Sequence, residues 1–432
     1  MGLLDELCSI ESYDALSNVL IDTKLHPMQT VDILKILYRK CGIFVYPTGT
    51  GKTFLAAGCM KMLLNENPDR KFIFCMKFSQ LAQTPKKLER ILGVKIISTS
   101  AEAKDIKNIM KSGKFLEYQV LLITHDCLNS KDFTQILFKN KQHYCCIFID
   151  EAHNVANVLG SNRGAMISAI CRQFEYRIAL TATPITSDIK QLCNLANILD
   201  PSTYNNPKIL EKKILNGSFS IKDDPCFFVS RTREEMGAEI QVNTYLRLIE
   251  PQLNQIGLYG EEATKACRID GINQALDLIE LLKEKISLKQ RGLVFVNRHA
   301  VREHLLSYLD RENIKYCCIN GNTSLEERSI LMEKFNDKKE FDVVLTSVTE
   351  ALDLDCNFVY FYEITLNVDQ MIGRSARGLT KKSIDVYFSV TEDTGEVDKI
   401  SNVIKTNKMI KRSINKSCKA LSDLENTYVD LG

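Results

Sequence analysis

The chain has 432 residues, enough for two or three domains, and its 45% hydrophobic and 25% charged residues are typical of globular proteins. No apolar run approaches the roughly 20 residues that span a bilayer, and the first residues are acidic where a secretory signal is basic. We therefore expect an intracellular protein, in the cytoplasm or nucleus and not in a membrane. Its net charge of only +2 provides no strong overall attraction for nucleic acid, so nucleic acid would have to bind in a locally basic groove.

Short apolar runs recur along the chain and predict the strands of two sheets. The first series covers residues 43–46, 71–76, 120–124, 145–149 and 176–180, and the second covers 292–296, 316–319, 343–345, 358–362 and 384–390. Runs that are apolar throughout and separated by helical stretches indicate parallel strands with helices on both faces. The sequence therefore predicts an α/β fold with two tandem domains of similar architecture.

A glycine-rich stretch follows the first predicted strand and precedes the apolar start of a helix. Between a strand and a helix, such a turn binds phosphates because its N–H groups and the helix N-terminus converge on the anion. Lys52 would reach the β and γ phosphates and the Thr53 hydroxyl would ligate Mg²⁺, although the first glycine of the usual pattern is missing. We predict that ATP is bound by Pro47, Thr48, Gly49, Thr50, Gly51, Lys52 and Thr53.

Two carboxylates follow the fourth predicted strand, in the order Asp150-Glu151-Ala152-His153. In open α/β sheets, ligands bind at the carboxyl ends of the strands. Asp150 would hold Mg²⁺ together with Thr53, and Glu151 would orient and deprotonate the water that attacks the γ-phosphate. The alternative, acids that cap the next helix, is less favoured because the Lys52 loop precedes them.

Polar residues also follow the fifth predicted strand. They form the stretch Thr181-Ala182-Thr183-Pro184, whose hydroxyls could couple the metal site to a neighbouring surface. Read alone, this stretch is an ordinary polar end of a strand.

The middle of the chain differs in composition from both strand series. Turn-forming residues are dense over 200–207, which marks the end of a domain, and the spacing of leucines and isoleucines predicts a helix over 273–285. We therefore expect an N-terminal domain over 1–205, a connecting segment over 206–285 and a C-terminal domain over 286–432.

The second half places two arginines three residues apart, Arg374 and Arg377, in a stretch that begins at Gln370. On a helix this spacing presents both guanidinium groups on one face. The pair could stabilise charge on the γ-phosphate of a facing ATP site, whereas surface ion pairs are the simpler alternative. Farther on, lysines and one arginine over 405–419 predict an amphipathic helix with a basic face, which is either solvated or in contact with a phosphate backbone.

Taken in order, these motifs resemble the core of the superfamily 2 helicases of the DExH type, over nearly the full length of the chain. Further stretches carry the same resemblance: 25–29 to the motif before the phosphate loop, 74–83 and 123–126 to motifs Ia and Ib, and 293–297, 346–353 and 370–377 to motifs IV, V and VI. Motif V is short and has Ala351 where a glycine is usual. The resemblance implies two tandem RecA-like domains with an interdomain ATP cleft.

The resemblance also implies roles for single residues. Gln29 would contact adenine, and Asp353 would lie near the ribose or at the contact between domains. The residues expected to hydrolyse ATP with Mg²⁺ are Lys52, Thr53, Asp150, Glu151, Arg374 and Arg377. Those expected to couple the ATP site to the nucleic-acid strand are His153, Thr181, Thr183 and Gln370.

The expected activity is that of an ATP-driven motor, a helicase or translocase, and DNA is favoured over RNA as its track. The Asp-Glu-Ala-His motif resembles that of Swi/Snf-type translocases and of phage and repair helicases, and the arginine-containing stretch 228–233 resembles one in Swi/Snf-type proteins. DEAH RNA helicases carry long C-terminal domains, whereas this chain ends about fifty residues after motif VI. The alternatives are an RNA helicase, the motor subunit of a larger restriction, transcription or remodelling complex, and a sensor that binds nucleic acid without hydrolysing ATP.

Overall fold

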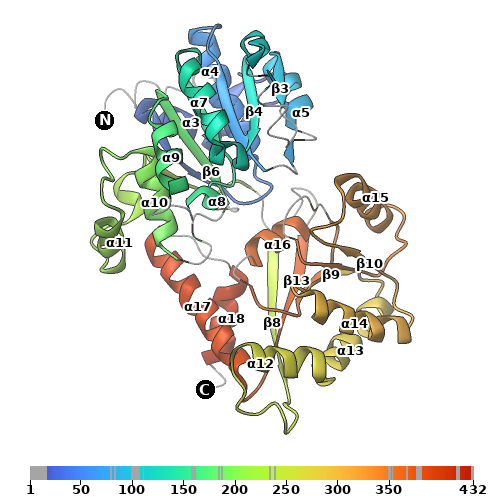
Figure 1. The fold of residues 1–432 in the computed structure, drawn as a ribbon. Coiled ribbons are helices and arrows are strands. Elements are labelled where there is room, and N and C mark those ends of the chain that lie inside the picture. The colour runs from blue at the N-terminus through green and yellow to red at the C-terminus, as the bar shows by residue number, and fades with distance from the viewer. Residues whose placement is uncertain are drawn as a thin grey trace. The chain divides into compact units, whose positions relative to one another are not determined.

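The computed structural model describes residues 17–77, 80–81, 84–98, 108–109, 111–156, 162–182, 185, 188–232, 235–237, 240–348, 352, 354–365, 368–375, 382–414 and 419–429. These residues form two compact units, of which unit 1 ends at Met236 and unit 2 begins at Gly237 (Figure 1). Three predicted site residues, Thr183, Asp353 and Arg377, lie outside the described residues. Within the described chain, no helix is long and apolar enough to cross a membrane.

Unit 1 is built around a sheet of seven parallel strands in the order β3-β4-β2-β5-β6-β1-β7. The strands are β1 Cys41–Val45, β2 Phe72–Met76, β3 Ile96–Ser98, β4 Val120–Thr124, β5 Cys146–Ile149, β6 Tyr176–Thr181 and β7 Phe228–Ser230. The α-helices are α3 Pro27–Arg39, α4 Lys52–Glu66, α5 Thr84–Leu92, α7 Lys131–Asn140, α8 His153–Ala156, α9 Asn162–Cys171, α10 Lys190–Leu199 and α11 Pro207–Leu215. Every residue of β1, β2, β4 and β5 is buried, as strands covered on both faces must be.

Unit 2 is built around six parallel strands in the order β10-β11-β9-β12-β13-β8. The strands are β8 Ile240–Ile249, β9 Gly292–Phe295, β10 Tyr316–Ile319, β11 Val343–Thr346, β12 Phe358–Phe361 and β13 Lys382–Thr391. The helices are α12 Gly260–Lys265, its π-helical continuation η6 Ala266–Asp270, α13 Asn273–Ser287, α14 His299–Arg311, α15 Leu325–Asn336, α16 Val368–Ser375, α17 Gly395–Ile414 and α18 Lys419–Val429. The prediction of two tandem α/β domains with parallel, RecA-like sheets is confirmed.

The segment 206–285 is shared between the two units instead of forming a separate connection. Strand β7 pairs with β1 at the edge of the first sheet, and β8 pairs with β13 over ten residues at the edge of the second. The sequence pattern missed β8 because polar residues such as Gln241, Asn243 and Arg247 alternate with apolar ones along it. An edge strand tolerates this alternation, whereas a central parallel strand does not.

The C-terminal region also differs from the expected single helix over 405–419. The chain forms α17 up to Ile414 and α18 from Lys419, and the two helices pack against each other. Ile404 and Leu421 are buried, and Lys408 forms an ion pair with Glu425 at 2.7 Å. At least this lysine of the predicted basic face is therefore paired within the unit.

Candidate active site

The phosphate loop leaves the sheet of unit 1 at the end of β1, between β6 and β7. The Tyr46 N–H donates to the Thr181 carbonyl at 3.0 Å, which continues the pairing of β1 with β6 into the start of the loop. Gly49 and Gly51 have φ of 83° and 91°, a left-handed conformation that favours glycine. Gly51 precedes α4 without a side-chain cap, so the first N–H groups of α4 are available to an anion.

Lys52 and Thr53 begin α4, and both are half-buried. The Lys52 Nζ lies 3.5 Å from the Tyr46 carbonyl, at the base of the loop. Gln29, in α3, is buried beside the loop, where its Nε2 donates to the Thr50 carbonyl at 3.1 Å and its Oε1 accepts from the His26 N–H at 2.9 Å. The predicted adenine contact of Gln29 would have to use the remaining hydrogen and lone pair of its amide.

Asp150 and Glu151 follow β5, which is separated from β1 by β6 alone. The Asp150 carboxylate is buried and accepts from the Gln80 Nε2 at 2.8 Å and from the Glu151 N–H at 2.9 Å. Burial and the adjacent Glu151 charge raise the pKa of Asp150 to about 6, while the positive charge of Lys52 opposes the rise. Loop and carboxylates are thus close enough for their charges to interact.

These donors fit Mg²⁺. A magnesium ion prefers oxygen ligands, which the Thr53 hydroxyl and the Asp150 carboxylate supply. Burial and the charge of the neighbouring Glu151 raise the pKa of Asp150, and a divalent cation would offset this negative charge. A bound cation at this position would lower the pKa of Asp150 again.

His153 links the carboxylates to β6. Its Nδ1 shares a hydrogen bond with the Thr181 hydroxyl at 3.1 Å and lies 3.6 Å from the Glu151 Oε2. Burial lowers the pKa of His153 to about 4, so the imidazole is neutral near pH 7 and its approach to Glu151 is not an ion pair. The structure therefore brings together three of the predicted residues, Glu151, His153 and Thr181.

Sequence reasoning missed two residues that hold Asp150. Gln80 follows β2 and donates to the Asp150 carboxylate, and His125 follows β4 with its Nε2 2.7 Å from the Asp150 carbonyl. Both lie in stretches that resemble motifs Ia and Ib, but neither had an assigned role. Since β2 pairs with both β4 and β5, a polar residue within four positions of the end of each strand was the available signal.

In unit 2, helix α16 carries two of the predicted residues, Gln370 and Arg374. The Arg374 carbonyl accepts from the Leu354 N–H at 2.9 Å, which joins α16 to the segment before β12. The Arg374 Nε is buried and has no hydrogen-bond partner among the described residues. This nitrogen is the kind of donor that an additional acceptor would satisfy.

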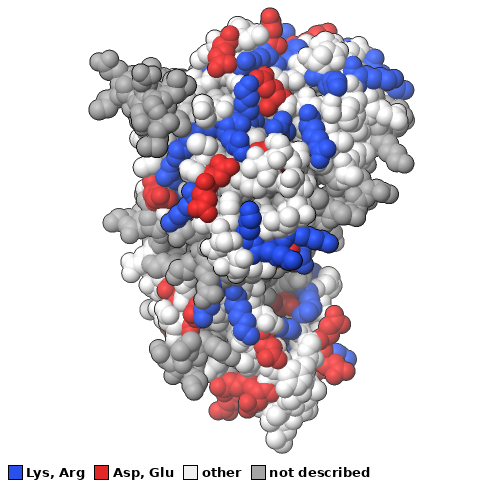
Figure 2. All heavy atoms as spheres, turned by 90° about the vertical axis from the view of Figure 1, so that its left-hand side faces the viewer, with Lys and Arg blue, Asp and Glu red and all other residues white. Residues whose placement is uncertain are grey.

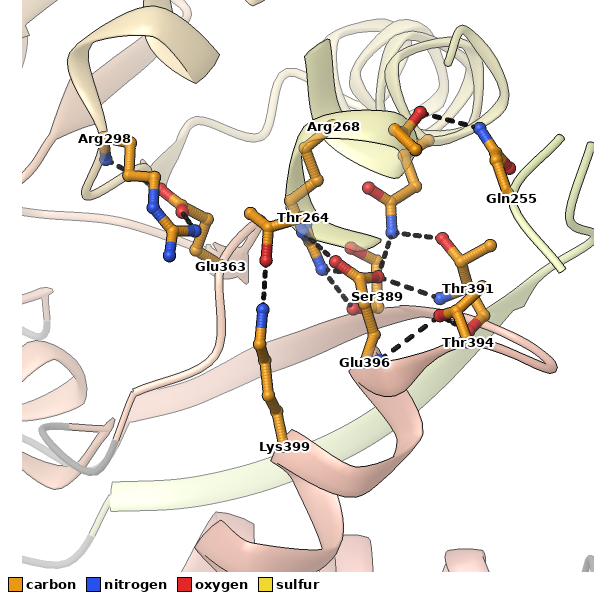
Figure 3. A network of polar contacts seen from close by, with 12 residues as sticks. Gln255, Thr264, Arg268, Arg298, Glu363, Ser389, Thr391, Thr394, Glu396 and Lys399 are labelled. Atoms are coloured by element: carbon orange, nitrogen blue, oxygen red, sulfur yellow. Dashed lines mark hydrogen bonds and ion pairs between the residues drawn. The ribbon is translucent and has the colours of Figure 1, made fainter. Parts of the chain in front are cut away.

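A cavity of about 300 Å³ lies at the carboxyl ends of β9, β11 and β12. Figure 3 shows the polar contacts in which several of its lining residues take part. Its lining is mostly polar and consists of Thr264, Arg268, Phe295, Asn297, Arg298, Ser347, Glu363, Ile364, Thr365, Glu396 and Lys399. Most of its charges are paired: Arg268 with Glu396 at 2.5 Å, and Arg298 with Glu363 at 3.0 Å. Lys399 donates to the Thr264 hydroxyl, and its pKa is lowered by burial.

Charged side chains of both signs occur on the face of the molecule that Figure 2 shows. On the face drawn in Figure 2, lysines and arginines are interspersed with aspartates and glutamates among the described residues. This distribution agrees with the net charge of +2. Recognition of a polyanion would therefore depend on local groups rather than on the field of the whole chain.

Two family models match the chain in order, one within each unit. The model described as type III restriction enzyme, res subunit, matches residues 22–186, and the helicase conserved C-terminal domain matches residues 273–379. The chain belongs to the superfamily 2 helicases. The family resemblance of its motifs is thereby confirmed, and the helicase models cover the phosphate loop, both carboxylates and both arginines.

Proteins similar to this helicase core include several chromatin-remodelling ATPases and two uncharacterized ATP-dependent helicases of Mycoplasma. Protein CHROMATIN REMODELING 19 of Arabidopsis thaliana is 25% identical over 49% of this chain and 29% of its own length. The ISWI chromatin-remodeling complex ATPase ISW1 of Saccharomyces cerevisiae is 23% identical over 58% of this chain and 28% of its own length. An uncharacterized ATP-dependent helicase of Mycoplasma genitalium, MG018, is 21% identical over 70% of this chain and 33% of its own length.

The helicase core thus spans about a third of the length of the curated relatives it matches. Among solved structures, the Sulfolobus solfataricus SWI2/SNF2 ATPase core in complex with dsDNA matches with a TM-score of 0.43 and 15% identity. That match covers 92% of this chain and 98% of the other.

Proposed function

We propose that this chain is an ATP-driven motor that moves on nucleic acid, a helicase or translocase of the Asp-Glu-Ala-His type. The observation that carries the proposal is the Asp150 carboxylate, which is buried beside Glu151 and interacts with the charge of Lys52. A phosphate loop alone binds nucleotides, whereas a loop with an adjacent carboxylate pair can also hydrolyse them. The match to helicase family models supports the same conclusion.

In this proposal, the residues of unit 1 bind ATP and activate water. Lys52 and the loop N–H groups hold the phosphates, and Thr53 and Asp150 would hold Mg²⁺, which neutralises charge on the β and γ phosphate oxygens when it is bound. Glu151 accepts the proton of the attacking water. Neutral His153, through Thr181, relays the state of the carboxylates to β6, and Gln29 reads the adenine.

Unit 2 completes the site in the proposed catalytic state. Arg374 and Arg377 act as arginine fingers on the γ-phosphate, and Asp353 contacts the ribose or the other unit. The buried Nε of Arg374, which has no partner among the described residues, supports this role. Gln370, on the same helix, and Thr183, after β6, take part in coupling hydrolysis to movement along the strand.

We favour DNA over RNA as the track. Relatives named for chromatin remodelling support this choice, and their names as complex ATPases support a larger assembly as a partner. An intracellular location, in the cytoplasm or nucleus, follows from the same activity.

In unit 2, the cavity at the carboxyl ends of β9, β11 and β12 is a candidate contact for a backbone phosphate. Asn297 and Ser347 lie in stretches that resemble motifs IV and V, and Arg298 and Lys399 supply positive charge. Contacts of this kind position nucleic acid without reading its sequence.

The test is the rate of phosphate release, measured in parallel with single-stranded DNA, duplex DNA, forked DNA and RNA. We expect DNA to stimulate turnover more than RNA and Lys52→Ala to reduce turnover to background. A non-hydrolysing sensor would bind nucleic acid without releasing phosphate. Turnover of Lys52→Ala at the parent rate would show that the site has been misassigned.

A further inference from the structure

A single carboxylate inside unit 1 holds two side chains that are far apart in the sequence. Asp32 lies in α3 and is completely buried. Its Oδ2 accepts from the Tyr46 hydroxyl and from the Arg231 Nε, both at 2.6 Å, and its Oδ1 accepts from the Arg231 Nη2 at 2.6 Å. The contact of Arg231 with Asp32 is bidentate, and a pair of parallel hydrogen bonds is sensitive to the orientation of both side chains.

A third partner, the Lys35 Nζ, lies 3.5 Å from the Asp32 Oδ1 within α3. The other two partners, Tyr46 and Arg231, lie at functionally distinct places. Tyr46 directly precedes Pro47 of the phosphate loop, and its carbonyl is the group that lies 3.5 Å from the Lys52 Nζ. Arg231 directly follows β7, where its N–H donates to the Val45 carbonyl at 3.1 Å. From Arg231, only five residues remain before unit 2 begins at Gly237.

Arg231 is also tied to the segment that leaves unit 1. Its Nη1 lies 3.5 Å from the Glu235 Oε1, and Glu235 accepts from the Thr232 N–H at 2.7 Å. One guanidinium thus connects the exit of the chain toward unit 2 with the carboxylate that holds the start of the phosphate loop.

Helix α3 holds the loop at two points. Gln29 contacts the Thr50 carbonyl, and Asp32, three residues later on the same face of α3, contacts the Tyr46 hydroxyl. A buried carboxylate needs paired donors, and loss of one partner is strongly unfavourable. Burial and Asp32 raise the pKa of Tyr46, which keeps its hydroxyl a donor, and the hydrogen bonds to Asp32 raise the pKa of Arg231.

The tyrosine also accounts for the missing first glycine of the phosphate-loop pattern, whose position it occupies. A glycine there has no side chain that could reach Asp32. The loop of this chain is therefore held by a side chain where the usual pattern has none.

We propose that Arg231 is a positioning residue through which the segment leading to unit 2 acts on the phosphate loop. A displacement of that segment shifts the guanidinium, Asp32 loses its bidentate partner, and the Tyr46 end of the loop is released. The proposal rests on the proposed function, because it assigns Arg231 a part in the stimulation of ATP turnover by nucleic acid.

The test compares Arg231→Met with Arg39→Met, a matched variant in α3. Arg39 pairs with the buried Asp200 at 2.8 Å and has no place in the site. We measure thermal stability, the KM for ATP, and the ratio of turnover with saturating duplex DNA to turnover without it. In Arg231→Met, the Tyr46 end of the loop is released whether or not DNA is bound, so we expect the ratio to fall about tenfold, which is within the usual range of a coupling between sites. In Arg39→Met, we expect a loss of stability with an unchanged ratio.

The outcomes separate the two proposals. A wild-type chain that DNA does not stimulate overturns both, whereas a stimulated wild type with an unchanged ratio in Arg231→Met overturns this proposal alone. An equal fall of basal and stimulated turnover also overturns it, because it shows a structural role. If Arg231→Met does not fold, Arg231→Lys replaces it. The lysine keeps the positive charge but cannot make the bidentate contact with Asp32, so the ratio of turnover with DNA to turnover without it should fall about threefold.

Discussion

The carboxyl edges of the two sheets differ more than the sheets themselves. Both sheets are parallel, and in both the polar groups follow the central strands. After β1 of unit 1 comes a loop with two left-handed glycines and an uncapped helix start, whereas after β9 of unit 2 come Asn297 and Arg298, whose N–H groups donate to Glu363. Unit 2 therefore satisfies these donors with its own carboxylate, whereas the proposed function assigns the donors of the unit 1 loop to a phosphate.

The acidic residues near the carboxyl ends of the strands also differ between the two units. Burial and the adjacent Glu151 raise the pKa of Asp150, whereas Glu396 in unit 2 is paired with Arg268 at 2.5 Å. A site that is to bind a cation keeps negative charge in excess, and a structural network balances it. The common fold thus supports one chemical site and one largely balanced network, and the difference lies in the residues after the strands.

The largest effect that would sharpen this contrast is expected from Glu151→Gln. The amide cannot accept the proton of the attacking water, so ATP turnover should fall to background while ATP binding is retained. Phosphate release and binding of a fluorescent ATP analogue measure the two properties separately. Glu175→Gln, which removes an exposed carboxylate paired with Lys40 in the same unit, is the control and should be active. Unchanged turnover in Glu151→Gln would contradict the assigned role.

The next largest effect tests whether unit 2 contributes to the chemistry. Arg374→Ala should lower DNA-stimulated turnover by about 10³, the lower end of the effect of an arginine finger. Arg374→Lys should restore little, because a lysine lacks the planar fork. Single-turnover hydrolysis measures the effect, and Arg311→Ala on α14 serves as a control. A loss of less than about threefold in Arg374→Ala would assign the residue to ion pairing instead.

The sequence predicted the parts of the fold and site that depend on local pattern. Fully apolar runs predicted β4 and β10 with their observed bounds, and the loop and the Asp150-Glu151 pair could be proposed as a site because their residues are continuous in sequence. The alternating strand β8 and the contacts of Gln80 and His125 with Asp150 were missed. These depend on which strands become neighbours, and strand order is a tertiary property.

A smaller effect is expected from pH. The pKa of Asp150 is raised from 3.8 to about 6, so its protonation should reduce activity as pH falls below 6, by about tenfold per unit. Stability has the opposite sign: the contribution of this group to the free energy of unfolding is present below about pH 4 and is lost as pH rises through 6. The dependence of kcat/KM on pH between 5 and 8 measures the first effect. Higher Mg²⁺ should move the acid limb to lower pH, and a flat profile would contradict a raised pKa.

The variant Gln80→Leu tests the same assignment by the pH dependence of kcat/KM. The hydrogen bond from Gln80 lowers the pKa of Asp150, so its removal should move the acid limb to higher pH. A shift in the opposite direction would show that Asp150 does not control the limb.

The smallest effect concerns the cavity of unit 2, where Lys399 and Arg298 would contact a backbone phosphate. Each cation that contacts a phosphate adds about one to the salt slope of binding. Lys399→Ala and Arg298→Ala should therefore each weaken DNA binding a few-fold and reduce the slope of log Kd against log salt by about one. Lys338→Ala, which removes an exposed lysine paired with Glu333, is the control. An unchanged slope of log Kd against log salt in both cavity variants would mean that this polar network only stabilises unit 2. The carboxyl edge of unit 2 would then be purely structural, in contrast to the proposed chemical site of unit 1.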